Sequence, residues 1–244
     1  MTIHHSHHKG HLENKKDHHN HCNHASQEAC IFSVPIFNHL EPEQMQEIMG
    51  VIKDRFYEKG EILYGDGDPS DSLYIVRSGK IRIYRLSESG KEQLVRILTP
   101  GDFTGELALF RKSIHTSFAE AMVKTEVCMI TRSDLQEFLL KYPSISLRIL
   151  AEFSNRLDEA ETQTTRFATE KVEARIAFFL AECIEEQESS EITLPMAKKD
   201  LASYLGTTPE TISRKLAELE DSGYIRQNSG RKIEILDLEG LLLV

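Results

Sequence analysis

The chain has 244 residues, of which 40% are hydrophobic and 28% charged, a balance that predicts a globular protein of one or two domains. Its formal net charge of −10 argues against nonspecific coating of nucleic acid, and no apolar run has the length of a membrane span or the position of a signal peptide. We therefore expect cytoplasmic residence, where the four cysteines are free, metal-bound or redox-active rather than a disulfide scaffold.

Residues 1–29 form a histidine-rich segment with almost nothing apolar to bury. The segment holds nine of the eleven histidines, together with Cys22. Such a composition predicts a flexible tail. Imidazole and thiolate groups suit transition metals, although the paired spacing of a zinc finger is missing. A purification tag and a solubilising tail are the alternatives to metal binding, for which the candidate ligands are His18, His19, His21, Cys22 and His24.

The next region predicts one helix followed by many strands. A helix is expected over residues 43–53, because four apolar residues recur at helical spacing: Met45, Ile48, Met49 and Ile52. Short alternating runs separated by glycine-containing turns then predict strands at 62–64, 73–76, 80–85, 93–98, 116–122 and 126–130. This spacing is typical of an antiparallel sandwich or jelly-roll barrel. Ser133 and Gln136 predict a capping box where helix resumes.

A long helix is expected from Pro143 to about residue 167. Its apolar residues alternate three- and four-residue steps, with one polar interruption, in the manner of a coiled-coil seam: Leu150, Phe153, Leu157, Ala160, Thr164 and Phe167. A seam on a helix of this length implies a partner, so we expect a homodimer. Packing of the helix on its own barrel is the alternative. A second helix is predicted over residues 170–186.

The C-terminal region has the pattern of a winged helix-turn-helix. Residues 194–206 predict a short helix that ends at Gly206. A second helix starts with Thr208 as its N-cap and Pro209 at its first position, and ends at Gly223. Residues 224–236 alternate as two short strands around a turn at 228–230, which predicts a wing.

The second of these helices carries the candidate DNA contacts. Ile212, Leu216 and Leu219 fall on one buried stripe. Arginine can bond a guanine edge in bidentate fashion, glutamate can accept from cytosine, and serine reaches several partners. A solvated face of an ordinary helical hairpin is the alternative, which the wing disfavours. The residues expected to contact DNA are Glu210, Ser213, Arg214 and Lys215.

The order of barrel, long helix and winged helix-turn-helix resembles the family of the bacterial cyclic-AMP receptor protein and the anaerobic regulator FNR. The resemblance covers residues 31–244 and rests on KGEILYGDGDPSDSLYIVRSGKIRIYR, PGDFTGELALF, VEARIAFFL and TPETISRKL. It implies that the His-rich tail (1–29) precedes an α+β chain with a cyclic-nucleotide-binding-like β-barrel of jelly-roll type (30–142), a dimerisation helix (143–168) and a DNA-binding winged helix-turn-helix (169–244). The implied partners are a second copy of the chain, palindromic double-stranded DNA with TGA-containing half-sites, and RNA polymerase, with no membrane.

The resemblance argues against cyclic AMP as the ligand. The phosphate-binding Arg-Ser pair of the cyclic-AMP receptor corresponds to Thr116-Ser117, and its adenine-binding Thr-Ser pair to Ala160-Glu161. Although Glu106 of the pocket persists, we expect no cation to face a phosphate and Glu161 to add a like charge. Burying a phosphate without a cationic partner is costly.

The cysteines imply alternative sensors. The chain resembles FNR in having an N-terminal cysteine, Cys30, and a barrel cysteine, Cys128, but Cys22 matches poorly and no close CxxC is present. The FNR-like (FLP-type) proteins of lactic-acid bacteria and streptococci resemble CIFSVPIFNHL more closely, which implies a thiol–disulfide switch between Cys30 and Cys128. The open alternatives are an oxygen-sensing iron–sulfur cluster on Cys22, Cys30 and Cys128, a transition-metal site or metal buffer in the tail, and Cys128 as a buried core thiol.

An enzyme is not expected. His115 is the only histidine after Leu40, so the barrel has no set of cupin-like metal ligands. The sequence also has no phosphate loop and no pattern of nucleophile, base and orienting residue.

Overall fold

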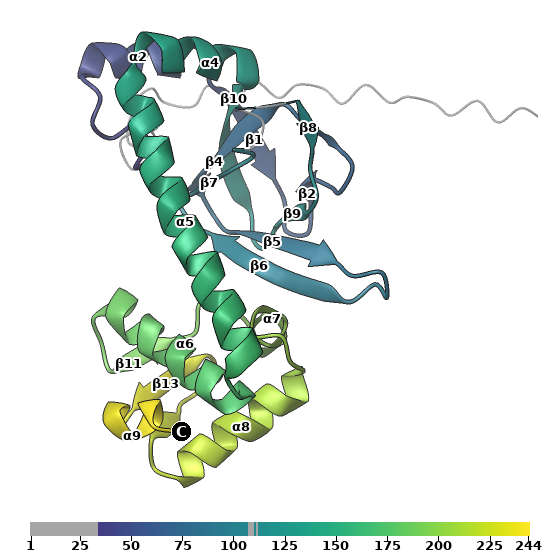
Figure 1. Cartoon of the computed structure of the whole chain (residues 1–244), viewed down its shortest axis with the longest axis vertical. Coiled ribbons are helices and arrows are strands. Elements are labelled where there is room, and N and C mark those ends of the chain that lie inside the picture. Colours follow the sequence, from purple (N-terminus) through teal and green to yellow (C-terminus); the bar gives the residue numbers. More distant parts are fainter. Residues whose placement is uncertain (1–33, 107–109, 111) are drawn as a thin grey trace, which may run out of the picture.

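The computed structural model describes residues 34–106, 110 and 112–244 (Figure 1). A strand-rich unit lies beside one long helix, and a smaller unit of helices with a short sheet lies at the lower end of that helix in Figure 1. We call these the barrel unit (residues 34–142) and the C-terminal unit (residues 170–244).

Two antiparallel four-stranded sheets form the barrel unit, with the strand orders β1-β10-β4-β7 and β2-β9-β5-β6. Val76, Ile83 and Val127, from both sheets, are buried against one another. The antiparallel barrel of the predicted fold is therefore present. The strands are β1 (Lys53–Tyr57), β2 (Ile62–Tyr64), β3 (Pro69–Ser70), β4 (Ser72–Ser78), β5 (Ile81–Leu86), β6 (Glu92–Leu98), β7 (Phe103–Thr104), β8 (Ser113–Ile114), β9 (Phe118–Ala121) and β10 (Thr125–Thr131).

The alternating pattern does not predict four of these strands. Strands β3, β7 and β8 have two residues each, too few to show a period of two. Strand β1 begins at Lys53, within the predicted helix. That helix, α2 (Pro42–Met49), ends earlier because Gly50 is its C-cap, and it buries only Met45 and Ile48.

Helix α4 (Arg132–Lys141) begins directly after β10, and its cap differs from the prediction. Thr131 is the N-cap, in extended conformation, and its hydroxyl accepts from the Asp134 amide. The predicted capping box at Ser133 is therefore wrong. Ser133 lies inside the first turn, because the chain changes from strand to helix at Thr131.

The long helix, α5 (Pro143–Thr169), extends beyond the predicted end. Ile145 and Ile149 are buried against the barrel unit. The Phe153 ring packs against that of Phe110, with the ring centroids 5.7 Å apart. Leu150 and Leu157, in contrast, are 59% and 58% exposed in the single chain. The predicted seam is thus divided, because Phe153 packs on the barrel unit while the two leucines lie on an open face.

The C-terminal unit contains the predicted helix-turn-helix and two-stranded wing, plus a third strand. Its elements are α6 (Val172–Gln187), β11 (Glu191–Thr193), α7 (Lys198–Tyr204), α8 (Pro209–Asp221), β12 (Ile225–Gln227), β13 (Lys232–Ile235) and α9 (Leu238–Leu242). The sheet order is β11-β13-β12. The bend at Pro195 occupies the start of the region expected to be helical, so α7 starts at Lys198. Across the described residues, no helix combines the length and hydropathy that crossing a membrane requires.

Candidate functional site

Helix α8 is the recognition-helix candidate, and its start is set by local chemistry. The Thr208 hydroxyl accepts from the Thr211 amide at 3.3 Å, and Pro209 occupies the first turn, as predicted. Ile212, Leu216 and Leu219 are buried in the core of the C-terminal unit. The opposite face of the first two turns is therefore presented to solvent.

Three of the four predicted DNA contacts lie on this solvent face, namely Glu210, Ser213 and Arg214. The Arg214 guanidinium donates to Glu218 at 2.9 Å, one turn along the same helix. Lys215, the fourth predicted DNA contact, is already paired within the protein, because its amine contacts Glu173 of α6 at 2.9 Å and Glu218 at 2.5 Å. These hydrogen bonds raise the pKa of Lys215. Lys215 therefore anchors α8 to α6 in this structure.

The turn between α7 and α8 is held from α6. Gly206 has a φ of +69°, a left-handed conformation that favours glycine. The Arg175 guanidinium donates to the Leu205 carbonyl at 2.6 Å and lies over the Phe167 ring. The end of α5 and the start of α6 thus fix the turn that orients α8.

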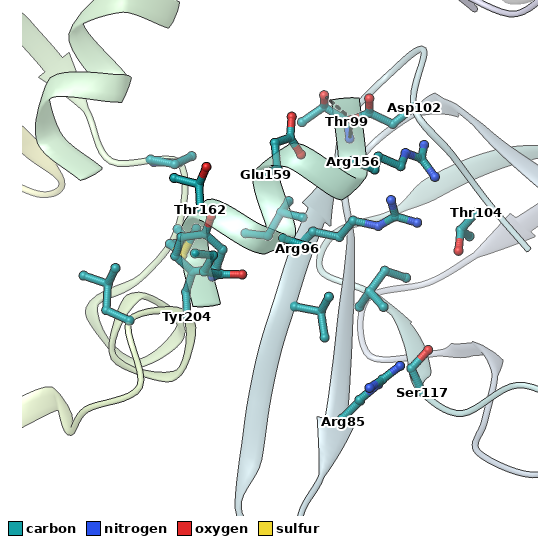
Figure 2. Close-up of a pocket in the computed structure, with 18 of the residues that line it drawn as sticks. Arg85, Arg96, Thr99, Asp102, Thr104, Ser117, Arg156, Glu159, Thr162 and Tyr204 are labelled. Atoms are coloured by element: carbon teal, nitrogen blue, oxygen red, sulfur yellow. Dashed lines mark hydrogen bonds between the residues drawn. The ribbon is translucent and has the colours of Figure 1, made fainter. Parts of the chain in front are cut away.

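A large cavity lies between the barrel unit, the C-terminal half of α5, and α6. Its volume is about 1120 Å³, and its lining comes from the barrel strands, from α5 and from the C-terminal unit. Figure 2 shows Arg85, Arg96 and Thr104 on the barrel side and Glu159, Thr162 and Tyr204 on the other side. The cavity is therefore lined by the barrel unit, by α5 and by the C-terminal unit.

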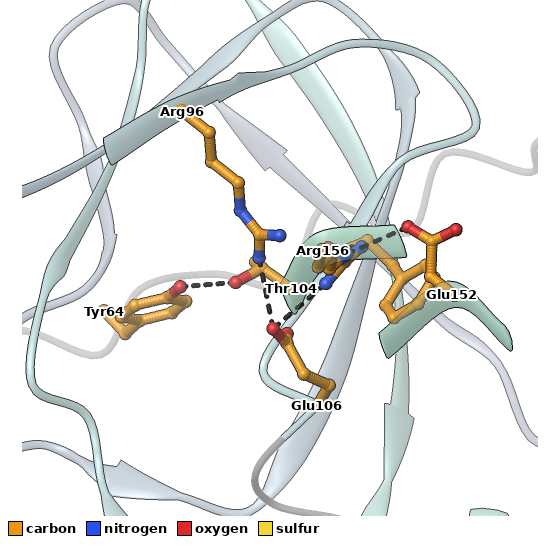
Figure 3. A network of polar contacts seen from close by, with 7 residues as sticks. Tyr64, Arg96, Thr104, Glu106, Glu152 and Arg156 are labelled. Atoms are coloured by element: carbon orange, nitrogen blue, oxygen red, sulfur yellow. Dashed lines mark hydrogen bonds and ion pairs between the residues drawn. The ribbon is translucent and has the colours of Figure 1, made fainter. Parts of the chain in front are cut away.

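Glu106 is at the centre of the polar network in this cavity (Figure 3). Its carboxylate accepts from Arg96 of β6 at 3.2 Å and from Arg156 of α5 at 3.0 Å. Arg156 also donates to Glu152 at 2.9 Å and lies over the Phe103 ring. One carboxylate thus joins the barrel unit to the long helix.

The expectation that no cation faces the ligand site is wrong. Arg85 donates to Thr116 at 3.3 Å, and Arg85, Arg96 and Arg156 all line the cavity. These arginines come from β5, β6 and α5, whereas the prediction considered only the two pairs of positions that match the cyclic-AMP receptor. Glu159 lines the cavity, and Glu161 is not among its described lining residues. Arginines are therefore present in the cavity, where Arg96 and Arg156 are already paired with Glu106.

His115 lies in the barrel wall of the cavity. Its ring stacks on Tyr64 with the centroids 3.6 Å apart, and its Nε2 atom is buried without a hydrogen-bond partner. The Tyr64 hydroxyl in turn bonds to that of Thr104 at 2.6 Å. Burial lowers the pKa of His115, although Asp68, Asp71 and Glu106 raise it.

Acidification below about pH 6.5 is expected to destabilise the fold through His115. Because its folded-state pKa is lowered, the unfolded chain binds a proton at higher pH than the folded chain. The free energy of unfolding is thus unaffected above the ordinary pKa of about 6.5 and falls as the pH drops below it. Denaturant unfolding at about pH 7.5 and pH 5.5 should show a smaller loss for His115→Gln than for the parent. Equal losses would contradict this role.

Cys128 lies in β10, 1% exposed, with its thiol 3.9 Å from the Asp54 carboxylate of β1. Arg77 pairs with Asp54 at 3.0 Å and with Glu126 at 2.5 Å. Burial lowers the pKa of Arg77, but Cys128 and these two carboxylates outweigh it and raise the pKa overall. The Cys128 thiol therefore lies beside a permanent cation and the carboxylates that pair with it.

The remaining candidate metal and cluster ligands lie outside the part of the chain that the structure describes. They are Cys22, Cys30, His18, His19, His21 and His24. Among the described residues, no group of three or more His, Cys, Asp or Glu side chains could hold a metal ion. Cys183 is buried in α6, and burial together with Glu186 and Glu182 raises its pKa to about 12, so it remains a neutral thiol.

Comparison with known proteins gives matches over both units. Residues 54–142 match the family of cyclic nucleotide-binding domains, and residues 174–243 match the Crp-like helix-turn-helix domain. The chain is 34% identical over 213 residues to the "Probable transcriptional regulator flp" of Lacticaseibacillus casei, covering 87% of this chain and 96% of that protein. It is 32% identical to the "Anaerobic regulatory protein" of Pasteurella multocida, with 88% and 81% covered. Among solved structures, FixK2 from Bradyrhizobium japonicum is similar, with a TM-score of 0.68, 29% identity and 78% and 96% of the two chains covered.

Proposed function

The chain belongs to the CRP/FNR family of transcriptional regulators, and from this we propose that it acts as a homodimer that places one α8 in each half of a palindromic DNA site. The relatives are regulators and not enzymes. Under this proposal the protein works in the cytoplasm, and RNA polymerase is a further partner at the promoter.

One observation supports the DNA-binding proposal most directly. Glu210, Ser213 and Arg214 lie exposed on the first two turns of a capped helix whose other face is buried. This is the position from which a recognition helix contacts base edges in the major groove. The proposed half-sites contain TGA, with the Arg214 guanidinium on the guanine.

Binding of a labelled duplex with two TGA half-sites tests the proposal by fluorescence anisotropy. Saturable binding of two chains per duplex is expected. Equal affinity for a duplex of the same composition in scrambled order would contradict it.

The proposed signal is the redox state of Cys30 and Cys128. The segment that follows Cys30 packs beside its proposed partner, since Val34, Ile36 and Phe37 belong to the same buried cluster as Cys128. Cys30 lies four positions before Val34, a chain length of at most about 14 Å, which leaves within reach the Cα separation below about 7 Å that a disulfide needs. A disulfide would tie the N-terminal segment to β10. Its alternatives are an iron–sulfur cluster on Cys22, Cys30 and Cys128, or metal bound by the tail.

Oxidation is expected to change operator affinity by a factor of about 5 to 150, the usual range for coupling between two sites. The measurement compares oxidised and reduced protein, then repeats the comparison with Cys30→Ser and Cys128→Ser. Each of these variants should bind the operator with the same affinity whether it is oxidised or reduced. Cys183→Ser is the matched control and should respond as the parent does. A parent with the same affinity in both redox states would remove the switch.

A further inference from the structure

The barrel unit and the C-terminal unit meet at the outer edge of β6. Strand β6 is the last strand of its sheet, so one side of its backbone is left without a neighbouring strand. The Leu94 amide donates to the Ser203 hydroxyl of α7 at 2.7 Å, and that hydroxyl donates to the Glu92 carbonyl at 2.9 Å. The Gln93 side chain donates to the Ser203 carbonyl at 2.5 Å. One serine of the helix-turn-helix therefore bonds to two backbone groups of this sheet edge.

Apolar packing and charge reinforce the same contact. Leu94 is 2% exposed and is buried in the core cluster of the C-terminal unit, beside residues such as Leu201 of α7. Ile97 of the same strand packs against that cluster. Arg82 of β5 lies 3.7 Å from Asp200 of α7. The contact thus combines hydrogen bonds, an ion pair and a buried side chain.

The same strand leads to the cavity. Arg96, two residues after Leu94, contacts Glu106, which also holds Arg156 of α5. In a regular strand, residues two apart face the same side. The pairing of β5 with β6 shifts register between Ile83 and Tyr84, an irregularity that re-aims side chains. Leu94 can therefore pack on α7 while Arg96 faces the cavity.

We propose that Ser203, with Glu92, Gln93 and Leu94 of β6, forms an interdomain latch that fixes the orientation of the helix-turn-helix relative to α5. The latch connects the Glu106 network to α8. The latched arrangement leaves Glu210, Ser213 and Arg214 exposed. Under this proposal it is the DNA-competent arrangement, and releasing it adds orientational freedom that binding must remove. This inference rests on the DNA-binding function proposed above.

Amide hydrogen exchange of the full chain tests whether the latch persists in solution. Ser203→Ala removes the hydroxyl that accepts from Leu94, so exchange in the segment 92–98 is expected to accelerate. Ser222→Ala is the matched control, because its hydroxyl bonds to Glu218 within the C-terminal unit. Exchange in that segment should be unchanged in the control. Unchanged exchange in Ser203→Ala would overturn the latch.

Measurements of operator affinity test whether the latch contributes to DNA binding. Gln93→Ala is expected to weaken binding by about twofold to tenfold, the range for one lost hydrogen bond, and Ser203→Ala, which removes two, by at least as much, with the same preference among sequences. Gln93→Ala leaves the DNA-binding unit unaltered, so it covers the case in which Ser203→Ala unfolds α7. If Arg214→Ala weakens binding while both latch variants bind as tightly as the parent, or more tightly, the latch is overturned and DNA binding stands. If Arg214→Ala has no effect, the DNA-binding proposal itself fails.

Discussion

Replacing Arg214 by alanine is expected to cost about 1–3 kcal/mol of specific binding free energy in each half-site, since this is the contribution of a bidentate arginine–guanine contact. In the free protein the guanidinium is 60% exposed and paired with Glu218 one turn away. An exposed pair of this kind contributes little. Arg214 can therefore exchange Glu218 for a guanine edge at small cost.

The preference among sequences should be lost together with the affinity. The parent should bind the TGA duplex more tightly than one with the guanine replaced, whereas Arg214→Ala should bind the two almost equally. Arg55→Ala is the matched control, because it removes one exposed arginine from β1, remote in sequence from α8. A variant that retains the parent's preference for TGA would rule out Arg214 as the contact.

The double variant Leu150→Glu/Leu157→Glu is expected to be monomeric. These leucines are more than half exposed in the single chain, and full burial of a leucine contributes about 1.5–3 kcal/mol. A dimer would bury four of them, and four unpaired carboxylates at the same seam would oppose association. Sedimentation velocity should give 27.9 kDa for the variant and twice that mass for the parent.

Loss of the dimer should also weaken operator binding by far more than loss of one contact. Two linked recognition helices bind the second half-site at high effective concentration, and separate chains do not. Leu86→Glu is the control, since it places the same charge at an exposed leucine of β5. A double variant that remains dimeric would show that α5 uses this face for something other than self-association.

The sequence predicts the C-terminal unit well because its signals are local. The threonine cap, the proline in the first turn and the spacing of Ile212, Leu216 and Leu219 define α8 within a dozen residues. The wing follows from a short alternating segment around a turn. The β-barrel is predicted as a class, yet its two-residue strands carry no periodic pattern, and β1 is hidden by the extension of a helical pattern beyond Gly50.

The polar network in the cavity cannot be predicted from local sequence signals. Glu106 contacts Arg96, ten positions earlier in β6, and Arg156, fifty positions later in α5. Ser203 meets β6 across more than a hundred positions. Nothing in the residue spacing indicates these pairs, because they depend on how the units pack. For the same reason, the two pairs of matching positions give no sign of the arginines that line the cavity.

A metal-buffering protein with a helix-turn-helix retained as an interaction module is the main competing function. It predicts that deletion of residues 1–29 abolishes activity and that Arg214→Ala is silent. Metal, iron and sulfide analysis with an absorption spectrum of protein purified without oxygen would separate the metal, cluster and thiol alternatives.

Selection from a pool of random duplexes tests the central claim most directly, because it assumes no operator. The full-length protein is predicted to enrich an inverted repeat whose TGA-containing half-sites lie about one helical turn apart, with two chains bound per duplex. Enrichment of no inverted repeat, or binding by a single chain, would contradict a dimer that reads DNA through α8.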